Sequence, residues 1–193
     1  ASGNTLSATV TGPGYVIWNS TDTSTSCAVL PTYSATVGRS VSAQSADDVG
    51  YLHLCADGTT GTSSLKIEVT DAAGTKQTLA TKTVTFFAKS AKTITLSAYQ
   101  PVIKVGANSD VIRATALDAD GNVWGGAANI YASAAADALI ASSATPVACT
   151  FDSALGLHKC PVAGTAKGTA NLKVIDAATV ALATATSDAA AVR

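Results

Sequence analysis

Short runs of alternating hydrophobic and polar residues recur along the whole chain. The clearest are 5–11 (TLSATVT), 78–87 (TLATKTVTFF) and 93–98 (TITLSA). A period of two places the hydrophobic residues on one face of a β-strand and the polar residues on the other. The pattern therefore predicts half-buried strands, and the turn-forming residues at 12–14 (GPG) and 119–122 (ADGN) predict turns between them.

The same reading predicts strands along the rest of the chain, at 15–18, 34–44, 51–56, 64–70, 102–105, 111–118, 128–133, 147–150, 155–160, 169–175 and 179–186. The Ala-rich segment 134–143 predicts a short helix or a loop. Strands that recur every ~8–12 residues with turn signals between them are typical of a β-sandwich. The predicted fold class is all-β.

One sequence unit occurs twice. LHLC at 52–55 is followed by GTSSLKI at 61–67, and LHKC at 157–160 is followed by GTANLKV at 168–174. The similarity between the two copies continues with DAA at 71–73 and 176–178, and with LAT at 79–81 and 182–184. An internal repeat fixes the architecture before single residues are interpreted. It predicts two tandem domains, 1–88 and 93–193, joined by a short linker at 89–92.

The chain has four cysteines, two in each copy. The natural pairing is Cys27 with Cys55 and Cys149 with Cys160, one disulfide inside each domain. Closing loops of these lengths contributes roughly 3 kcal/mol in chain-entropy estimates. Such bonds imply an oxidising compartment, so we expect a secreted protein at the surface of a cell or virion. The alternative is four free thiols in a cytosolic protein.

The chain has few charged residues, and they are divided almost evenly between its two halves. Charged residues are 13% of the chain and the net charge is −1. Five basic and six acidic residues precede Ala91, and seven of each follow it. Neither half has the basic face that nucleic-acid binding needs. No uncharged apolar run reaches the ~18 residues of a membrane span, so no membrane insertion is predicted, and we expect that any signal peptide has been removed.

His53 and His158 each lie two residues before a cysteine, on the same face of a predicted strand. The pair His-x-Cys could supply two zinc ligands, but a closed zinc site needs four. The two copies would also lie in different domains. We therefore interpret both histidines as structural residues beside a disulfide, and predict no metal site there.

Asp118, Asp120 and Asn122 have the alternate spacing of a calcium-binding loop. Position 129, where an EF-hand has an acidic residue, is Asn129. The same residues form hairpin turns without any ion, which is the favoured interpretation. Calcium stays open as a candidate, and no other cofactor is predicted. Asn19 begins an Asn-Ser-Thr triplet and is a candidate glycosylation site.

Patterns for catalysis are missing from the sequence. The chain has a single glutamate, Glu68, and neither a Gly-x-Ser-x-Gly elbow nor a phosphate-binding glycine loop. The sequence therefore predicts that the protein is not an enzyme.

The segment DADGN at 118–122, followed by Gly126-Ala127 and Ile130-Tyr131, resembles the bacterial immunoglobulin-like domains of the invasin and intimin type. That family has Pro and Val where this chain has Val123 and Trp124. The resemblance covers about twenty residues directly and extends over 92–193. It implies two tandem immunoglobulin-like β-sandwiches with a structural or adhesive role.

We therefore expect a structural component of a bacterial surface layer or filament, whose modules self-associate into an array. One alternative is an adhesin stalk or tip that binds a host protein or carbohydrate. Another is a decoration or tail domain of a phage particle, and the last is an accessory domain of an enzyme.

Overall fold

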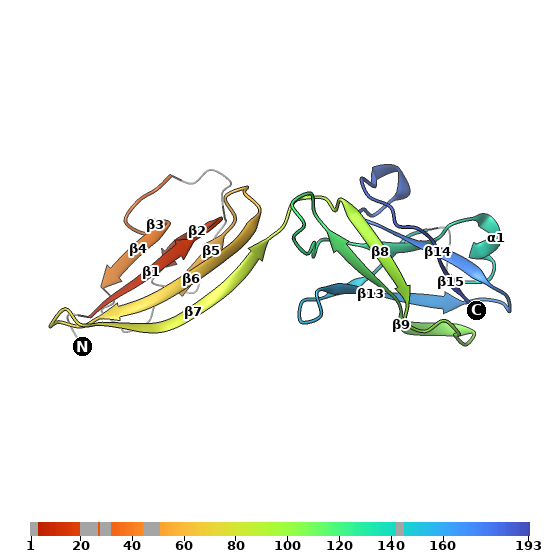
Figure 1. Cartoon of the computed structure of the whole chain (residues 1–193), viewed down its shortest axis with the longest axis horizontal. Helices are drawn as coiled ribbons and strands as arrows, with labels where there is room; N and C mark the ends of the chain where they lie inside the picture. The colour runs from red at the N-terminus through yellow and green to blue at the C-terminus, as the bar shows by residue number, and fades with distance from the viewer. Residues whose placement is uncertain (1–3, 20–26, 28–31, 45–50, 142–144) are drawn as a thin grey trace. The chain divides into compact units, whose positions relative to one another are not determined.

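The computed structural model describes residues 4–19, 27, 32–44, 51–141 and 145–193. The chain forms two compact units, Ala1–Phe86 and Phe87–Arg193. Both consist of antiparallel strands, and the helical segments of the described part are the short α1 (Ala135–Ala138) and η1 (Val180–Leu182) (Figure 1). The predicted all-β class with two β-sandwich units is confirmed.

The first unit has two antiparallel sheets, in the orders β4-β1-β6-β7 and β3-β2-β5. Its strands are β1 (Thr5–Thr11), β2 (Tyr15–Asn19), β3 (Val37–Gly38), β4 (Ser40–Gln44), β5 (Tyr51–Cys55), β6 (Gly61–Thr70) and β7 (Lys76–Phe86). The prediction for residues 5–11 matches β1 at both ends.

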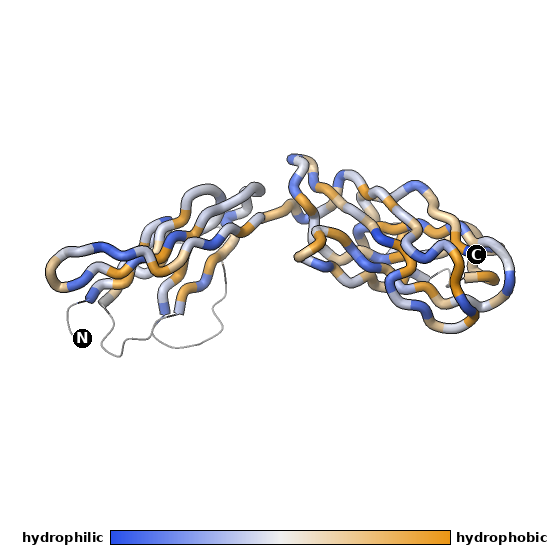
Figure 2. The backbone as a smooth tube through the Cα atoms, turned by 60° about the horizontal axis from the view of Figure 1, so that its bottom comes forward, coloured by the Kyte–Doolittle hydropathy of each residue, from blue (hydrophilic) through white to orange (hydrophobic). Residues whose placement is uncertain are grey.

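The core of the first unit lies between these sheets. Among the described residues, its buried side chains are Ala8, Val10, Val16, Val41 and Leu65. Trp18 from β2 and Leu52 and Leu54 from β5 pack against them from the second sheet. Figure 2 shows the alternation of hydrophobic and hydrophilic positions along the strands that produces this one-sided burial.

The second unit also has two antiparallel sheets, in the orders β12-β13-β9-β8 and β11-β10-β14-β15. Its strands are β8 (Thr93–Ala98), β9 (Gly106–Leu117), β10 (Asn129–Ala132), β11 (Val147–Ala148), β12 (Thr150–Asp152), β13 (Leu157–Gly164), β14 (Ala170–Ile175) and β15 (Ala190–Val192). The prediction for residues 93–98 matches β8, and the predicted helix or loop at 134–143 contains α1.

The core of the second unit is larger than that of the first. Ile112 from β9, Ile130 from β10 and Leu172 from β14 are fully buried, and Trp124 packs with them. The segment 89–92, expected as a linker, lies within this unit. Ala91 belongs to its core, and the Lys92 N–H donates a hydrogen bond of 2.7 Å to the Leu117 carbonyl.

The two sequence copies place their matching residues in similar roles. Cys55 ends β5 and Cys160 lies in β13, and both are buried. Leu65 in β6 and Leu172 in β14 both point into their cores. The strand Gly-Thr-x-x-Leu-Lys therefore supplies an inward leucine in each unit, as the repeat predicts.

The strand connections nevertheless differ between the copies. β5 pairs with β2, and β6 pairs with the strand that precedes β2, which is β1. In the second unit β13 pairs with β9, and β14 pairs with the next described strand, β10. The partner strands occur in opposite order along the chain. The strands that carry the repeat thus pack in similar ways in the two units, but the complete strand topologies of the units differ.

Two predicted strands are wrong. Residues 102–105 are irregular, although the Ile103 N–H donates to the Arg193 carbonyl at 2.8 Å. The segment 179–186 contains η1 rather than a strand, because the Asp176 carboxylate accepts the N–H groups of Thr184 and Ala185 and folds the chain into a loop. The strand that pairs with β14 on this side is β15. The sequence similarity between 79–81 and 182–184 therefore has no counterpart in the structure.

Candidate functional site

Both predicted disulfides are present, Cys27–Cys55 and Cys149–Cys160. In each unit the later cysteine lies on a core strand, and the bond ties it to a residue earlier in the chain. The Cα atoms are 5.4 Å apart in the first bond and 4.2 Å apart in the second. Each bond closes a loop inside one unit, so it constrains that unit alone.

His158 is fully buried in an aromatic cluster of the second unit. Its ring centroid lies 5.0 Å from that of Phe151 and 5.6 Å from that of Trp124. His158 Nε2 is 2.9 Å from the Gly126 carbonyl oxygen. Because a carbonyl only accepts, Nε2 carries the proton and donates. This geometry is that of a core residue.

The two histidines lie in different units, His53 on β5 of the first and His158 on β13 of the second. Within the described residues, no group of three or more His, Cys, Asp and Glu side chains has the arrangement that could hold a metal ion. The histidines and cysteines of the repeat are thus distributed over the two units.

Gly126 lies directly beneath the Trp124 indole. A Cβ atom at this position would be 2.3 Å from Cζ2 of Trp124. At neighbouring Gly125 a Cβ atom would be 2.8 Å from Cε1 of Phe151. Gly126 of the sequence motif and its neighbour Gly125 therefore have a packing reason, because only glycine leaves room for these rings.

The calcium candidates form a tight turn around Asp118, which is buried. Its Oδ1 accepts the backbone N–H groups of Asp120 and Asn122, at 3.0 and 2.8 Å. Its Oδ2 accepts the backbone N–H of Ala88 at 3.0 Å and the Asn122 side-chain amide at 3.2 Å. Both carboxylate oxygens are thus directed at N–H donors. The arrangement suits a structural turn, in which the side chain satisfies backbone groups.

Asn19 is the last residue of β2 and lies opposite Tyr51 of β5. The other two residues of the glycosylation triplet, Ser20 and Thr21, lie outside the described residues.

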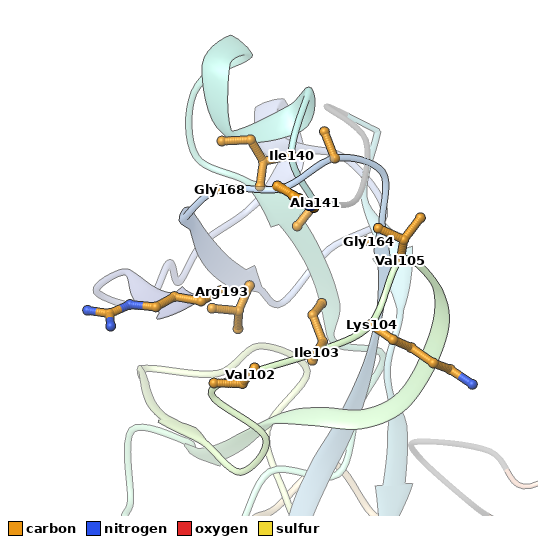
Figure 3. Close-up of a pocket in the computed structure, with 12 residues that line it drawn as sticks. Val102, Ile103, Lys104, Val105, Ile140, Ala141, Gly164, Gly168 and Arg193 are labelled. Atoms are coloured by element: carbon orange, nitrogen blue, oxygen red, sulfur yellow. The ribbon is translucent and has the colours of Figure 1, made fainter.

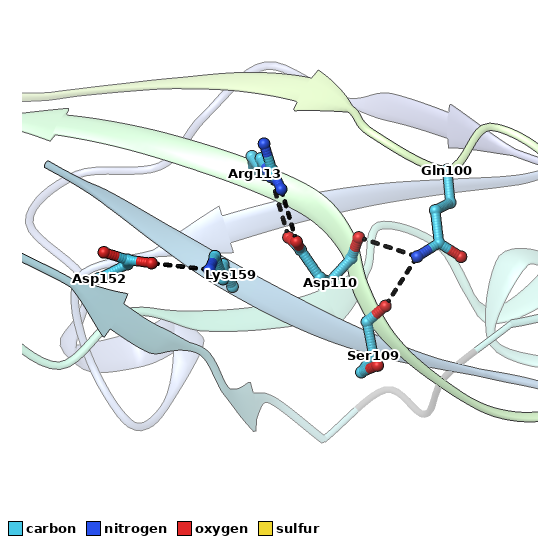
Figure 4. A network of polar contacts seen from close by, with 6 residues as sticks. All are labelled: Gln100, Ser109, Asp110, Arg113, Asp152 and Lys159. Atoms are coloured by element: carbon cyan, nitrogen blue, oxygen red, sulfur yellow. Dashed lines mark hydrogen bonds and ion pairs between the residues drawn. The ribbon is translucent and has the colours of Figure 1, made fainter. Parts of the chain in front are cut away.

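A ladder of charges crosses the outer face of the sheet β12-β13-β9-β8 (Figure 4). Lys159 and Arg113 lie opposite each other on β13 and β9. Asp152 pairs with Lys159 at 2.6 Å, and Asp110 pairs with Arg113 at 2.7 Å. The Arg113 guanidinium holds the pKa of the Asp110 carboxyl below its ordinary value, against the opposing effect of burial. Each cation of the ladder therefore has its own carboxylate.

Arg113 also stacks on an aromatic ring, with its Cζ 3.4 Å from the ring centroid of Tyr99. Gln100 donates hydrogen bonds to the carbonyls of Ser109 and Asp110, at 3.0 and 3.4 Å. These contacts hold Asp110 in its left-handed conformation, with φ 51°. The ladder keeps this face of the sheet polar and internally paired.

A pocket of about 190 Å³ opens on the surface of the second unit (Figure 3). It lies between four segments: the irregular residues 102–105, residues 140–141 that follow α1, residues 164–168, and residues 192–193 at the end of β15. The charged side chains that line it are Lys104, Lys167 and Arg193. Those of Lys104 and Arg193 extend outward on opposite sides of the pocket (Figure 3).

Neither the pocket nor the charge ladder was predicted from the sequence. Lys159 and Arg113 occupy polar positions in strands whose polar and apolar residues alternate. The register that places the two residues opposite each other depends on how the strands pair, and the sequence of neither strand specifies it. The pocket combines four segments that are separate in the sequence, and the exposure of Val102 and Val105 has no sequence signal.

No protein-family model and no curated protein sequence matches this chain. In structure, the chain is similar to invasin, a bacterial integrin-binding protein, with 17% identity and a TM-score of 0.39 over 100% of this chain and 32% of that chain. It is similar to the S-layer protein rSbsC, with 16% identity and a TM-score of 0.32 over 74% of this chain and 17% of that one. It is also similar to the C-terminal domain of the AgI/II polypeptide BspA of Streptococcus agalactiae, with 9% identity and a TM-score of 0.31 over 99% and 84% of the two chains.

The chain spans about a third of the length of the invasin chain that it matches. Its assignment as two β-sandwiches rests on its own strand order and buried residues. None of the helices in the described part of the chain is long and apolar enough to cross a membrane.

Proposed function

We propose that this chain is a structural part of a bacterial cell-surface assembly, a surface layer or a filament. The observation that carries the proposal is the tandem arrangement of two β-sandwiches, each closed by its own disulfide. A covalently closed module resists unfolding because its unfolded chain is constrained. Such modules suit an exposed, oxidising surface, where they would resist unfolding under mechanical force.

We also propose that the protein is not an enzyme. Glu68 is held in an ion pair with Lys66 at 2.6 Å, and His158 is buried between aromatic rings. Neither group is placed to exchange protons with a bound substrate, since general acid–base catalysis needs a side chain within hydrogen-bond reach of the substrate.

Assembly by the purified chain tests the structural proposal. The protein should form sheets or filaments visible by negative-stain electron microscopy, with a repeat set by the module size. A chain that stays monodisperse at high concentration while binding a host protein or a glycan on an array would favour the adhesin function instead. Reduced protein is the matched control, because modules destabilised by loss of their disulfides should form a less regular repeat.

A further inference from the structure

We propose that the pocket of the second unit binds an extended peptide in which one large apolar side chain is flanked by carboxylates. The pocket supplies an apolar recess for the side chain and a basic rim for the acidic groups. Both features come from described residues of this unit alone, so the proposal is independent of the assembly proposed above.

The recess is apolar and has the size of a single side chain. Val102, Ile103, Ile140 and Val192 contribute to its wall. A cavity of about 150 Å³ with such a lining holds a benzene-sized group, so about 190 Å³ accommodates a phenylalanine or leucine side chain. Pockets for whole small molecules are larger, roughly 300–1,000 Å³. The size therefore favours one anchoring side chain over a complete cofactor or lipid.

Two apolar side chains that line the recess are largely exposed, and an exposed leucine lies next to it in the sequence. Val102 is 73% exposed and Val105 is 65% exposed, and Leu139, next to Ile140, is 74% exposed. An extended segment whose anchor enters the recess would cover these side chains on either side. Burial of a central apolar anchor within a broader contact is the usual source of binding energy at protein interfaces.

The charge of the rim selects acidic flanks. The charged residues that line the pocket are Lys104, Lys167 and Arg193, with no Asp or Glu among them. The side chains of these three residues make no ion pair or hydrogen bond with the described part of the chain. The cations of the charge ladder differ, since Arg113 and Lys159 are each paired with an aspartate. Unpaired cations around an apolar recess are complementary to carboxylates beside an apolar side chain.

Titration of the ¹⁵N-labelled 193-residue chain with the peptide acetyl-Gly-Asp-Glu-Phe-Glu-Asp-Gly-amide tests the proposal. Amide resonances of residues 102–105, 140–141 and 164–168 should shift and saturate, and the apparent affinity should fall as salt is raised, because exposed charge pairs are screened. The same peptide with Ala in place of Phe should bind about tenfold more weakly, since it lacks the anchor. A peptide with Lys in place of the acidic residues should not bind.

Two variants separate charge from packing. The double variant Lys104→Glu/Lys167→Glu should lower the affinity about tenfold, and Val102→Ser/Val105→Ser, at exposed positions, should lower it without affecting the fold. The matched control Lys76→Glu/Lys82→Glu, on exposed β7 of the first unit, should change the affinity less than twofold.

Four results of the peptide titrations would overturn the proposal, and a fifth comes from the protein without peptide. The four are no saturable shift at the pocket, equal binding of the lysine peptide, an affinity unchanged by the Lys104→Glu/Lys167→Glu variant, and saturation by decanoate where the acidic peptide does not bind. Pocket shifts that depend on protein concentration without any peptide would assign the site to a second copy of the chain, and would equally overturn it.

Discussion

The backbone N–H of Ala88 donates a hydrogen bond of 3.0 Å to Oδ2 of Asp118, thirty residues further along the chain. Asp118 is only 3% exposed, and its Oδ1 accepts the backbone N–H groups of its own turn. The carboxylate therefore joins the start of the second unit to the turn after β9. Asp118 therefore has a structural role that the spacing of Asp118, Asp120 and Asn122 did not indicate.

The Asp118 contacts predict a pH dependence for the second unit. Burial raises the pKa of the carboxyl, and the N–H donors of Ala88 and Asn122 lower it by more, so the folded value lies below the ordinary one. The stabilisation should be complete above about pH 5 and should be lost as pH falls below about 4 through the depressed folded pKa. Denaturant unfolding followed by Trp124 fluorescence in a Trp18→Phe background measures it.

In the same assay Asp118→Asn should weaken the acid dependence by the part that Asp118 contributes, and the part due to other carboxyls of this unit with lowered pKa values, such as Asp110 and Asp137, should remain. The substitution should also destabilise the second unit by about 1–3 kcal/mol at neutral pH, because the new amide would direct N–H groups at N–H donors. Exposed Asp188→Asn is the control, and should leave stability at neutral pH unchanged. A second unit whose stability is the same at pH 7 and pH 3 would contradict the assignment.

Calcium should not stabilise the second unit. Both oxygens of Asp118 already accept N–H donors, and a calcium ion needs about six to eight oxygen ligands. The unfolding midpoint should therefore be equal in millimolar CaCl₂ and in EGTA. A saturable shift of the Asn122 amide resonance on calcium addition would instead identify the turn as a calcium site.

Gly126→Ala should destabilise the second unit by about 1–3 kcal/mol through overpacking. The added Cβ would lie 2.3 Å from Trp124 Cζ2, so the indole must move. A change in Trp124 fluorescence of the folded protein should accompany the loss. Gly38→Ala is the matched control, because its Cβ would find no atom nearer than 3.6 Å. Equal effects of the two substitutions would argue against the packing of Trp124 on Gly126.

Leu172→Ala should cost the second unit about 2–5 kcal/mol, since it removes a fully buried side chain from the larger core. Leu65→Ala should fall at the lower end of that range, because the first core is small and Leu65 is 8% exposed. Urea unfolding with Trp18 and Trp124 as separate probes should show each loss in its own unit. Leu139→Ala, at an exposed position, is the control. A loss that appears in the wrong unit would refute the separate cores.

Each disulfide should stabilise only its own unit. Cys149→Ser/Cys160→Ser should cost the second unit about 3 kcal/mol and leave the first unit unchanged, and Cys27→Ser/Cys55→Ser should do the reverse. Peptide mapping of the oxidised protein should recover both linked pairs. Four thiols that react with an alkylating reagent without reduction would refute both the pairing and the proposed extracellular location.

The sequence resolved much of the strand pattern because alternation is a local property. Residues 5–11 and 93–98 were predicted as strands and are strands over those residues. Leu65 and Leu172, at matching positions of the repeat, are both buried. In each case neighbouring residues carry the signal, since a strand with one buried face must place its apolar side chains on alternate positions.

The site features depended on contacts between distant segments. The Asp118 turn was recognisable from its residues, but its hydrogen bond to Ala88 was not. Residues 179–186 form a loop because hydrogen bonds to Asp176 outweigh the alternating pattern of apolar and polar residues. The aromatic packing on Gly126 likewise involves rings from separate segments.

The sequence by itself determined that this is an all-β protein of two disulfide-closed units, because strand periodicity, turn residues and the repeated cysteines are all readable in order along the chain. Only the tertiary structure decided that β6 pairs with β1 while β14 pairs with β10, that Lys159 faces Arg113, and that an apolar pocket has a basic rim. Pairing partners and surface recesses arise from residues far apart in the chain, and a local pattern cannot specify which distant segment will meet it.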